Sequence, residues 1–568
     1  MSYDLVVRGG EIIDGSGLSG YRADVGIVGD KIAKIGRIAE RGREEINAEG
    51  HVVTPGFIDG HTHMDAQINW DPLGTSSCWQ GVTTAVMGNC GFTLAPSKSD
   101  QRALVVRNLE RAEDISGAAM AAGIKWNWET FPEYIDFVDQ VPKGINYASY
   151  VGHSALRTWA MGERAFEEVA NEADVALMES QLLAGLKAGA IGFSTSRSPH
   201  HQTSDDRPVA SRMASWDEVR RLVGVMGKHG SGIFELAIEQ GARVMDPRQR
   251  TEALGRMQAL AVETGVPMTW GLVVAGNEAT EAWQAQLALL DSTAKLGGRM
   301  FGQSHSREVA ILTSFRTQLP FDKLPEWADV RARPLEEQKV LLRDPEVRAR
   351  LVHSAHHGNY GHAVGAEARK PKWERLWVYD KPMPPYSSVG QRAAQKGTDP
   401  VDVMIDLALE TDFDQFFMQS ANEADEAATL QILRHPRVVM TFSDTGAHVT
   451  QISDCSIHTH LLAYWVRERG IFSLEEGVRM ITLATARAWG LSDRGLLREG
   501  LLADINIFDP VRLTPEMPKL VSDLPGGASR LTQRATGILA TIVNGKILLK
   551  NGQHTGALPG RFLRRSAG

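Results

Sequence analysis

The sequence is poor in cysteine, with only Cys78, Cys90 and Cys455 among its 568 residues. So few thiols cannot form the disulfide framework of a small secreted protein, and we expect a cytoplasmic location. No run of about 20 apolar residues is present, which argues against a transmembrane helix. The opening residues, MSYDLVVRGGEIIDG, have no basic region followed by an apolar stretch, so we expect no signal peptide.

A surplus of positive charge is also absent. The net charge is −8 at pH 7, with 23% charged and 43% hydrophobic residues, which is the composition of a globular protein. Such a chain has no electrostatic attraction for nucleic acid or for an anionic membrane surface, so we expect a small-molecule substrate as its partner. The sequence carries no interface signature, and a homo-oligomer remains open.

The two ends of the chain share a β-rich texture. Near the N-terminus, YDLVVRGGEIIDG and ADVGIVGDKIAKIG are β-branched runs broken by Gly-Gly and Gly-Asp turns, a pattern typical of hairpins. Near the C-terminus, ADINIFD and GILATIVNGKILLKNG repeat this pattern with an Asn-Gly turn. We predict a small β-sandwich domain built from residues 1–54 and 485–568.

Between these ends, short apolar strands alternate with helical patterns. The predicted strands lie at 56–61, 82–90, 146–153, 190–195, 232–236, 267–273, 299–304 and 437–444. Eight strands with crossover helices favour an α/β fold of the (β/α)8 TIM-barrel type. We assign the barrel to residues 55–317 and 401–484.

The stretch between the last two strands is too long for a single crossover helix. Residues 318–400 are rich in charge, proline, histidine and aromatic residues, and we predict an inserted subdomain or lid over the C-terminal mouth of the barrel. A cluster within it forms either part of this lid or a polar surface; its members are His353, His356, His357, Tyr360 and His362.

The stretch PGFIDGHTHMD places two histidines at the end of the first predicted barrel strand. Residues i and i+2 of a strand share a face, so His61 and His63 point the same way. Two imidazoles at a barrel mouth suit a divalent metal such as Zn²⁺. The alternative is a hydrogen-bonded pair of histidines without a metal.

Two further side chains end neighbouring strands. Asp444, in TFSDTGAH, ends the eighth strand, where a carboxylate can ligate a metal and take a proton from water. Cys90, in VMGNCGF, ends the second strand, and a thiolate is a strong zinc ligand. The alternatives are an aspartate that caps the following loop and a cysteine that acts as a small buried hydrophobe.

These motifs occur together with VGHSALR, GAIGFSTSRSP, SDTGAH and the tail GLLADINIFD … VNGKILLKNG … TGALPGR. In this order and over nearly the whole chain, the set resembles the amidohydrolase superfamily, and within it the D-aminoacylase, or N-acyl-D-amino-acid deacylase, branch. The resemblance implies a metal-bearing barrel, a sandwich made from both termini and an insertion before the last strand. It also implies an enzyme that hydrolyses carbon–nitrogen bonds other than peptide bonds.

Carried over residue by residue, the resemblance implies metal ligation by His61, His63 and Cys90, with Asp444 as the catalytic acid and base and a further ligand. His153, in VGHSALR, corresponds to a residue that contacts substrate or supports the site, although a core histidine remains open. The fourth strand offers no lysine for a carbamate bridge, so we expect one Zn²⁺ per chain.

Two metal-binding histidines of the resembled pattern are missing. Their positions fall at about Ala237 on the fifth strand and Leu272 on the sixth. Glu235 lies two residues before the first of these and faces the same side of the strand. It is either a replacement ligand or a glutamate that is paired with an arginine or hydrogen-bonded near the barrel floor. His305, at the end of the seventh strand, is a further candidate for the metal or the substrate.

The predicted reaction is deacylation of an N-acyl amino acid, in which zinc lowers the pKa of its water towards about 7 and Asp444 moves the proton. Arg197, beyond the fourth strand, suits a substrate carboxylate, unless it is an ordinary solvated loop arginine. The alternatives are hydrolysis of a cyclic amide, imide, carbamate or aryl amide, and a metal-free barrel that acts as a binding protein.

Overall fold

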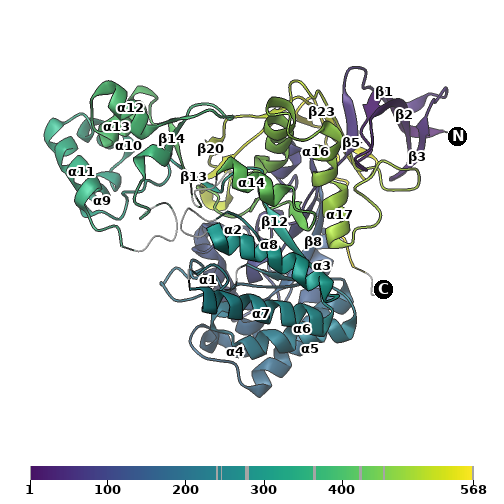
Figure 1. The fold of residues 1–568 in the computed structure, drawn as a ribbon, viewed down its shortest axis with the longest axis horizontal. Helices are drawn as coiled ribbons and strands as arrows, with labels where there is room; N and C mark the ends of the chain where they lie inside the picture. The colour runs from purple at the N-terminus through teal and green to yellow at the C-terminus, as the bar shows by residue number, and fades with distance from the viewer. Residues whose placement is uncertain are drawn as a thin grey trace.

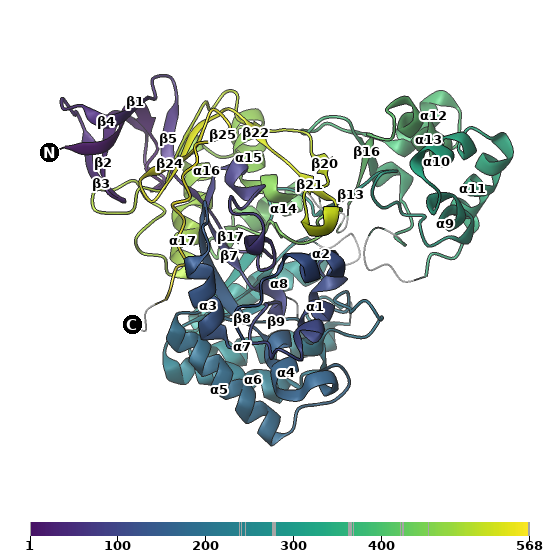
Figure 2. The ribbon, with the colours of Figure 1, turned by 180° about the vertical axis from the view of Figure 1, so that it is seen from behind.

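The computed structural model describes residues 2–237, 239, 241–244, 246–274, 280–361, 366, 368–420, 422, 425–451 and 454–565. The chain forms a strand-and-helix barrel with two additions (Figure 1). Seen from the front and from behind, a mostly helical insertion and the strands of the N-terminus lie at opposite ends of the longest axis (Figure 2).

A parallel sheet of eight strands forms the centre, in the order β6-β7-β8-β9-β10-β11-β12-β17. The bounds are β6 Phe57–Asp59, β7 Val82–Met87, β8 Asn146–Gly152, β9 Gly192–Thr195, β10 Ile233–Leu236, β11 Met268–Gly271, β12 Met300–Ser304 and β17 Val438–Met440. Each falls on a predicted strand, so this part of the prediction is confirmed. Nearly every residue of these strands is buried, which explains their continuous apolar sequences.

The sheet curls until its two outer strands approach one another. Just beyond them, Thr62 and Thr445 form a parallel bridge, and the backbone N–H of Gly60 donates to the hydroxyl of Thr441. The curled sheet fits the predicted TIM barrel, and it brings the chain that follows β6 against the chain that follows β17.

Helices cover the outside of the sheet (Figure 1). They are α1 Arg102–Glu110, α2 Gly117–Gly123, α3 Phe131–Gln140, α4 His153–Met161, α5 Glu172–Ala188, α6 Trp216–His229, α7 Pro247–Thr264, α8 Thr280–Lys295, α14 Glu426–Leu433, α16 Leu474–Ile481 and α17 Leu483–Trp489. Within the described residues, no helix combines the length and the apolarity that crossing a membrane requires.

Strands from both termini form a second sheet, in the order β25-β24-β23-β18-β5-β1-β2-β3, with β4 beside β1. The bounds are β1 Tyr3–Ile12, β2 Tyr21–Val28, β3 Lys31–Gly36, β4 Gly42–Asn47, β5 Val52–Pro55, β18 Ile505–Phe508, β23 Ile538–Val543, β24 Lys546–Lys550 and β25 Gln553–His554. The antiparallel pair of β5 and β18 joins the two ends. The shared sheet agrees with the prediction, while its description as a sandwich stays a prediction.

The segment between β12 and β17 has its own sheet and its own apolar core. Its sheet pairs β13 Ala310–Thr313, β16 Phe416–Ser420, β14 Leu376–Tyr379 and β15 Ser387–Ser388, and its helices are α9 Pro325–Arg331, α10 Leu335–Leu341, α11 Pro345–His357, α12 Val389–Lys396 and α13 Pro400–Glu410. Core side chains run from Phe315 to Phe417, so they extend beyond the predicted insertion at 318–400, whose limits stay a prediction.

The histidine cluster of the insertion lies partly on α11. The ring of His356 contacts Asp399 at 2.8 Å, and the rings of His353 and His357 lie 4.7 Å apart between centroids, tilted by 41°. His362 lies outside the described residues. The Asp399 contact supports a structural role for His356 within the insertion.

The terminal sheet is tied to the barrel by a buried ion pair. Asp504, just before β18, accepts from Arg494 (2.8 Å), from the side chain of Asn146 at the start of β8 (3.1 Å) and from the backbone of Asn544 (2.7 Å). Both charged side chains are almost fully buried. The same arginine also contacts Asp493, whose side chain is 55% exposed.

We expect Asp504→Ala to destabilise the fold by about 3–5 kcal/mol, because it leaves a buried guanidinium without its counter-charge. Loss of the exposed partner, in Asp493→Ala, should cost less than about 1 kcal/mol. Urea unfolding followed by circular dichroism measures both. Equal effects of the two substitutions would contradict the assignment of Asp504 as the connecting residue.

Candidate metal centre

Three potential ligands meet at the C-terminal ends of β6 and β7. His61 and His63 follow β6, and Cys90 follows β7 in a left-handed conformation (φ 56°) between two glycines that also have positive φ. One ligand atom from each of the three lies within 4.8 Å of the other two, and all three residues are buried. The Cys90 Sγ is 3.5 Å from the Nε2 of His61.

Asp444 reaches the same point from the other edge of the sheet. Its Oδ1 lies 3.2 Å from the Nε2 of His61 and 3.5 Å from that of His63. The loop that carries it fits tightly against the first strand, because a Cβ at Gly446 (φ 99°) would lie 2.5 Å from the carbonyl oxygen of His63. The glycine of SDTGAH therefore lets the aspartate come within reach of both imidazoles.

These separations fit a single bound ion. Two nitrogen or oxygen ligands at about 2.0–2.1 Å from a tetrahedral zinc lie about 3.3 Å apart, and a sulfur and a nitrogen about 3.5 Å apart. The distances from His61 Nε2 to Asp444 Oδ1 (3.2 Å) and to Cys90 Sγ (3.5 Å) match these edges. The donor set of imidazole, thiolate and carboxylate also suits zinc.

A glutamine that sequence reasoning missed orients one of the imidazoles. The Oε1 of Gln303, on β12, is 2.6 Å from the Nδ1 of His61, and its amide nitrogen donates to the hydroxyl of Thr269 at 3.1 Å. Gln303 therefore accepts a hydrogen bond from the Nδ1–H of His61 and leaves Nε2 free for a metal. The only available signal was a polar residue within an otherwise apolar strand.

Glu235 lies beneath the ligands, on β10. Its Oε2 accepts a 2.7 Å hydrogen bond from the backbone of Cys90, and its Oε1 has no hydrogen-bond partner among the described residues. Burial raises its pKa to about 7. No arginine pairs with it in the described part of the chain, which leaves two interpretations, a replacement ligand and a glutamate held by its hydrogen bond.

A second carboxylate near the ligands was also not foreseen. Glu113, in the loop after α1, is buried, and its Oε2 lies 3.7 Å from the Nε2 of His63. Its sequence context, RAEDISG, matches no metal-binding motif. The structure alone brings it to the site.

Burial makes negative charge costly throughout this cluster. It raises the pKa of Glu113 and of the Cys90 thiol well above their usual ranges, and neighbouring carboxylates raise both further. Burial acts in the same direction on Asp444, but hydrogen bonds with His61 and His63 hold its pKa well below the usual range. A divalent cation would compensate the acidic groups that the fold places together.

The predicted substrate contacts have different surroundings. Both ring nitrogens of His305 are buried without a hydrogen-bond partner among the described residues, and the ring packs on Phe442, 4.7 Å between centroids. Phe442 also packs on His61. An unpartnered imidazole beside the metal ligands keeps His305 as a candidate for the metal or the substrate.

His153 does not fit the predicted substrate contact. Its two ring nitrogens contact the hydroxyl of Thr195 at 2.7 Å and the carboxylate of Glu218 at 2.8 Å. The same carboxylate binds the buried Arg157. Because neither ring nitrogen is available, the core-histidine alternative fits better.

Arg197 is engaged within the protein rather than solvated. Its Nε lies 3.0 Å from the Oε2 of Glu239, although the pair is not aligned as a hydrogen bond, and its Nη1 donates to the carbonyl of Ala214 at 2.8 Å. The counter-charge weakens the argument for Arg197 as the anchor of a substrate carboxylate. The sequence could not reveal this partner.

The two missing histidine positions lie where the sequence placed them. Ala237 directly follows β10 and Leu272 directly follows β11, at the same end of the barrel as His61. Leu272 is fully buried. Neither side chain can bind a metal.

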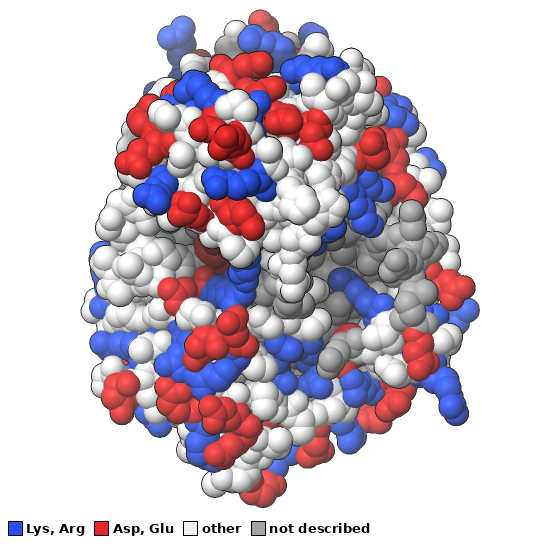
Figure 3. Space-filling model, turned by 90° about the vertical axis from the view of Figure 1, so that its left-hand side faces the viewer, with Lys and Arg blue, Asp and Glu red and all other residues white. Residues whose placement is uncertain are grey.

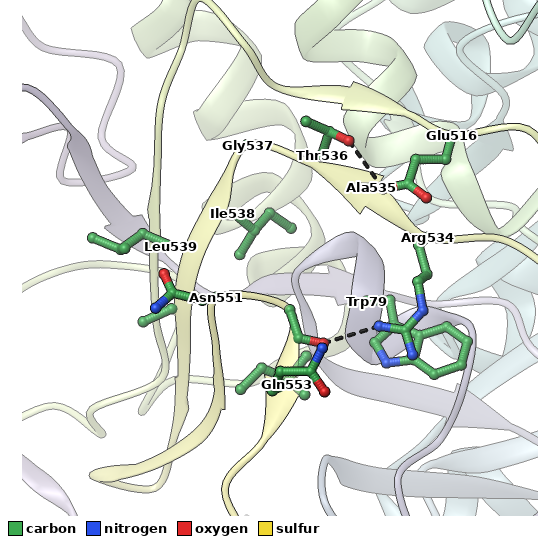
Figure 4. Close-up of a pocket in the computed structure, with 13 residues that line it drawn as sticks. Trp79, Glu516, Arg534, Ala535, Thr536, Gly537, Ile538, Leu539, Asn551 and Gln553 are labelled. Carbon is green, nitrogen blue, oxygen red and sulfur yellow. Dashed lines mark hydrogen bonds between the residues drawn. The ribbon is translucent and has the colours of Figure 1, made fainter.

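A small cavity adjoins Asp444. A cavity of about 30 Å³ is lined in part by Asp444, Ser443 and Asp454, enough for a water molecule. A cavity of about 300 Å³ lies elsewhere, between Trp79 and the C-terminal strands (Figure 4). There the Arg534 guanidinium covers the indole ring and donates to the carbonyl of Gly552, so its polar group already has a partner.

Comparison with known proteins agrees with this arrangement. The sequence pattern of the amidohydrolase family matches residues 44–549. The D-aminoacylase of Alcaligenes xylosoxydans xylosoxydans is 28% identical over 100% of this chain and 98% of its own length. The N-acyl-D-glutamate deacylase of the same organism is also 28% identical, over 99% of this chain and 97% of its own length. A solved D-aminoacylase structure, studied for its binuclear metal centre, has a TM-score of 0.67 and 25% identity, covering 99% of this chain and 100% of its own. With its barrel, its ligand cluster and this match, the chain belongs to the amidohydrolase family.

Proposed function

We propose that the protein is a metal-dependent hydrolase that removes the acyl group from an N-acyl amino acid, with one zinc ion per chain. The convergence of His61, His63, Cys90 and Asp444 at one end of the barrel carries this proposal. Relatives that match over nearly the whole chain include D-aminoacylase, N-acyl-D-aspartate deacylase and N-acyl-D-glutamate deacylase. None of the three cysteines forms a disulfide, which agrees with a cytoplasmic location.

The residues divide the chemistry between them. His61 and His63 would hold the metal through Nε2, and Gln303 keeps the first imidazole in the tautomer that allows this. Cys90 and Glu235 are the proposed additional ligands. When bound, the metal supplies a Lewis acid for a carbonyl group and lowers the pKa of water.

Asp444 is placed to move the proton. Its Oδ1 lies between the two imidazoles, and a water-sized cavity adjoins the residue. A carboxylate there accepts a proton from the attacking water and delivers it to the amide nitrogen as the carbon–nitrogen bond breaks. His305, with both ring nitrogens unpartnered, is the proposed contact for the substrate beside it.

The surface on the side that bears the insertion carries charges of both signs. Acidic and basic side chains are interspersed there around a central hollow (Figure 3). Because Arg197 is paired with Glu239, its proposed role as the carboxylate anchor depends on that ion pair opening. Cyclic amides, which lack a carboxylate, form the second candidate class, and this ion pair is the observation that favours them.

The first test is the metal. We expect mass spectrometry to find about one zinc per chain and to find none in a variant that carries both His61→Ala and His63→Ala. Removal of the zinc by a chelator should abolish activity, and added zinc should restore it. Failure of the purified chain to bind any metal, even with zinc supplied, would favour the binding-protein alternative.

Replacing Asp444 separates proton transfer from metal binding. Asp444→Asn should reduce kcat by roughly 10²–10⁴-fold, because the amide cannot accept the proton, while the histidines and Cys90 retain metal. The assay compares N-acetyl-D-amino acids with hydantoins. Undiminished turnover in this variant would remove Asp444 from the mechanism.

Gln303 provides a test one step away from the metal. Gln303→Leu should weaken zinc binding by about 10–100-fold, because His61 loses the acceptor that fixes its tautomer. Gln303→Glu, which keeps an acceptor at this position, is the matched control. Competition with a fluorescent chelator measures the affinities, and equal affinity for all three proteins would contradict the assignment.

A further inference from the structure

Glu113 is held against the loop that carries Asp444. The backbone N–H of His448 donates to the carbonyl of Glu113, and the hydroxyl of Thr450 donates to the neighbouring Asp114 at 2.7 Å. These bonds fix the segment after α1 to the loop after β17. The Glu113 carboxylate is thereby positioned by the same loop that positions the proposed acid and base.

The carboxylate itself is poorly satisfied for a buried acid. Its Oε1 has no hydrogen-bond partner among the described residues. Its Oε2 faces two imidazoles, with the Nε2 of His63 at 3.7 Å and that of His448 at 4.0 Å. Neither distance is a hydrogen bond. No lysine or arginine forms an ion pair with it in the described part of the chain, so protein groups alone leave this buried acid uncompensated.

A structural role does not explain this environment. Buried carboxylates that support a fold are usually paired or hydrogen-bonded at both oxygens, as Asp504 is in this chain. Glu113 instead has one unpartnered oxygen and a second oxygen at 3.7 Å from a proposed ligand nitrogen. That separation is close to the edge of about 3.3 Å between two ligands of one tetrahedral ion.

We propose that Glu113 is a ligand of the metal bound by His61 and His63, and that it makes up in part for the histidines missing at Ala237 and Leu272. The inference rests on the proposed metal-dependent function and extends its ligand set. It would join Asp444 and the proposed ligands Cys90 and Glu235 around the ion, and it adds a carboxylate, a type of ligand that favours harder divalent cations than thiolates do.

The test measures metal binding rather than turnover. Wild-type protein, Glu113→Gln and Glu113→Asp are compared by zinc competition with a fluorescent chelator, and by the visible spectrum after loading with Co²⁺. Glu110→Gln, in the same segment, is the control, because glutamine can still accept the hydrogen bond from the backbone of Gly117. Thermal unfolding in the presence of a chelator checks that each variant folds.

We expect Glu113→Gln to weaken zinc binding at least about tenfold and to shift the Co²⁺ spectrum. Glu113→Asp should give an intermediate affinity, and it provides the same readout if the glutamine variant does not fold. Wild-type affinity and spectrum in both Glu113 variants would overturn this inference but leave the hydrolase proposal standing. Absence of metal from wild-type protein would instead overturn both.

Discussion

The central constraint on this structure is buried negative charge. The barrel brings Asp444, Glu235 and Glu113 together around two imidazoles and a thiol. Glu235 and Glu113 are buried, and the Asp444 side chain is 15% exposed. Isolated carboxylates in such surroundings cost several kcal/mol each unless they are neutralised. Buried arginines elsewhere in the core are paired with carboxylates, as Arg494 and Arg157 are. Among the described residues, no arginine or lysine pairs with the acids of this cluster.

The local backbone is built to keep the cluster compact. Cys90 takes a left-handed conformation at the end of β7, and Asp444 does so after β17 (φ 53°). Such conformations are uncommon for residues with a side chain and persist where surrounding contacts hold them. Gly446 removes the side chain that would separate the two loops. Two of the left-handed residues therefore lie where the candidate ligands converge.

Much of the fold could be predicted because each strand can be recognised from a short stretch of sequence. The eight strands are short apolar runs that are buried on both sides, and the His-x-His pair places two side chains on one face of a strand. Glu113 and Gln303 could not be found in this way, since their partners lie far away in the sequence. The substrate contacts predicted for His153 and Arg197 could not be checked from the sequence either. Their partners in the structure are Glu218 and Glu239, which also lie far away in the sequence.

The missing histidines illustrate how a site can change while its scaffold is kept. An imidazole is neutral when it binds a metal, whereas each carboxylate adds a negative charge, so a carboxylate-rich ligand set reduces the net positive charge of the bound ion. A less positive ion is a weaker Lewis acid and lowers the pKa of its water less. Gln303 has the opposite effect, because a neutral amide acceptor leaves His61 neutral and so preserves the positive charge of the ion. The balance between these groups, more than the fold, determines how strongly this centre can activate a substrate.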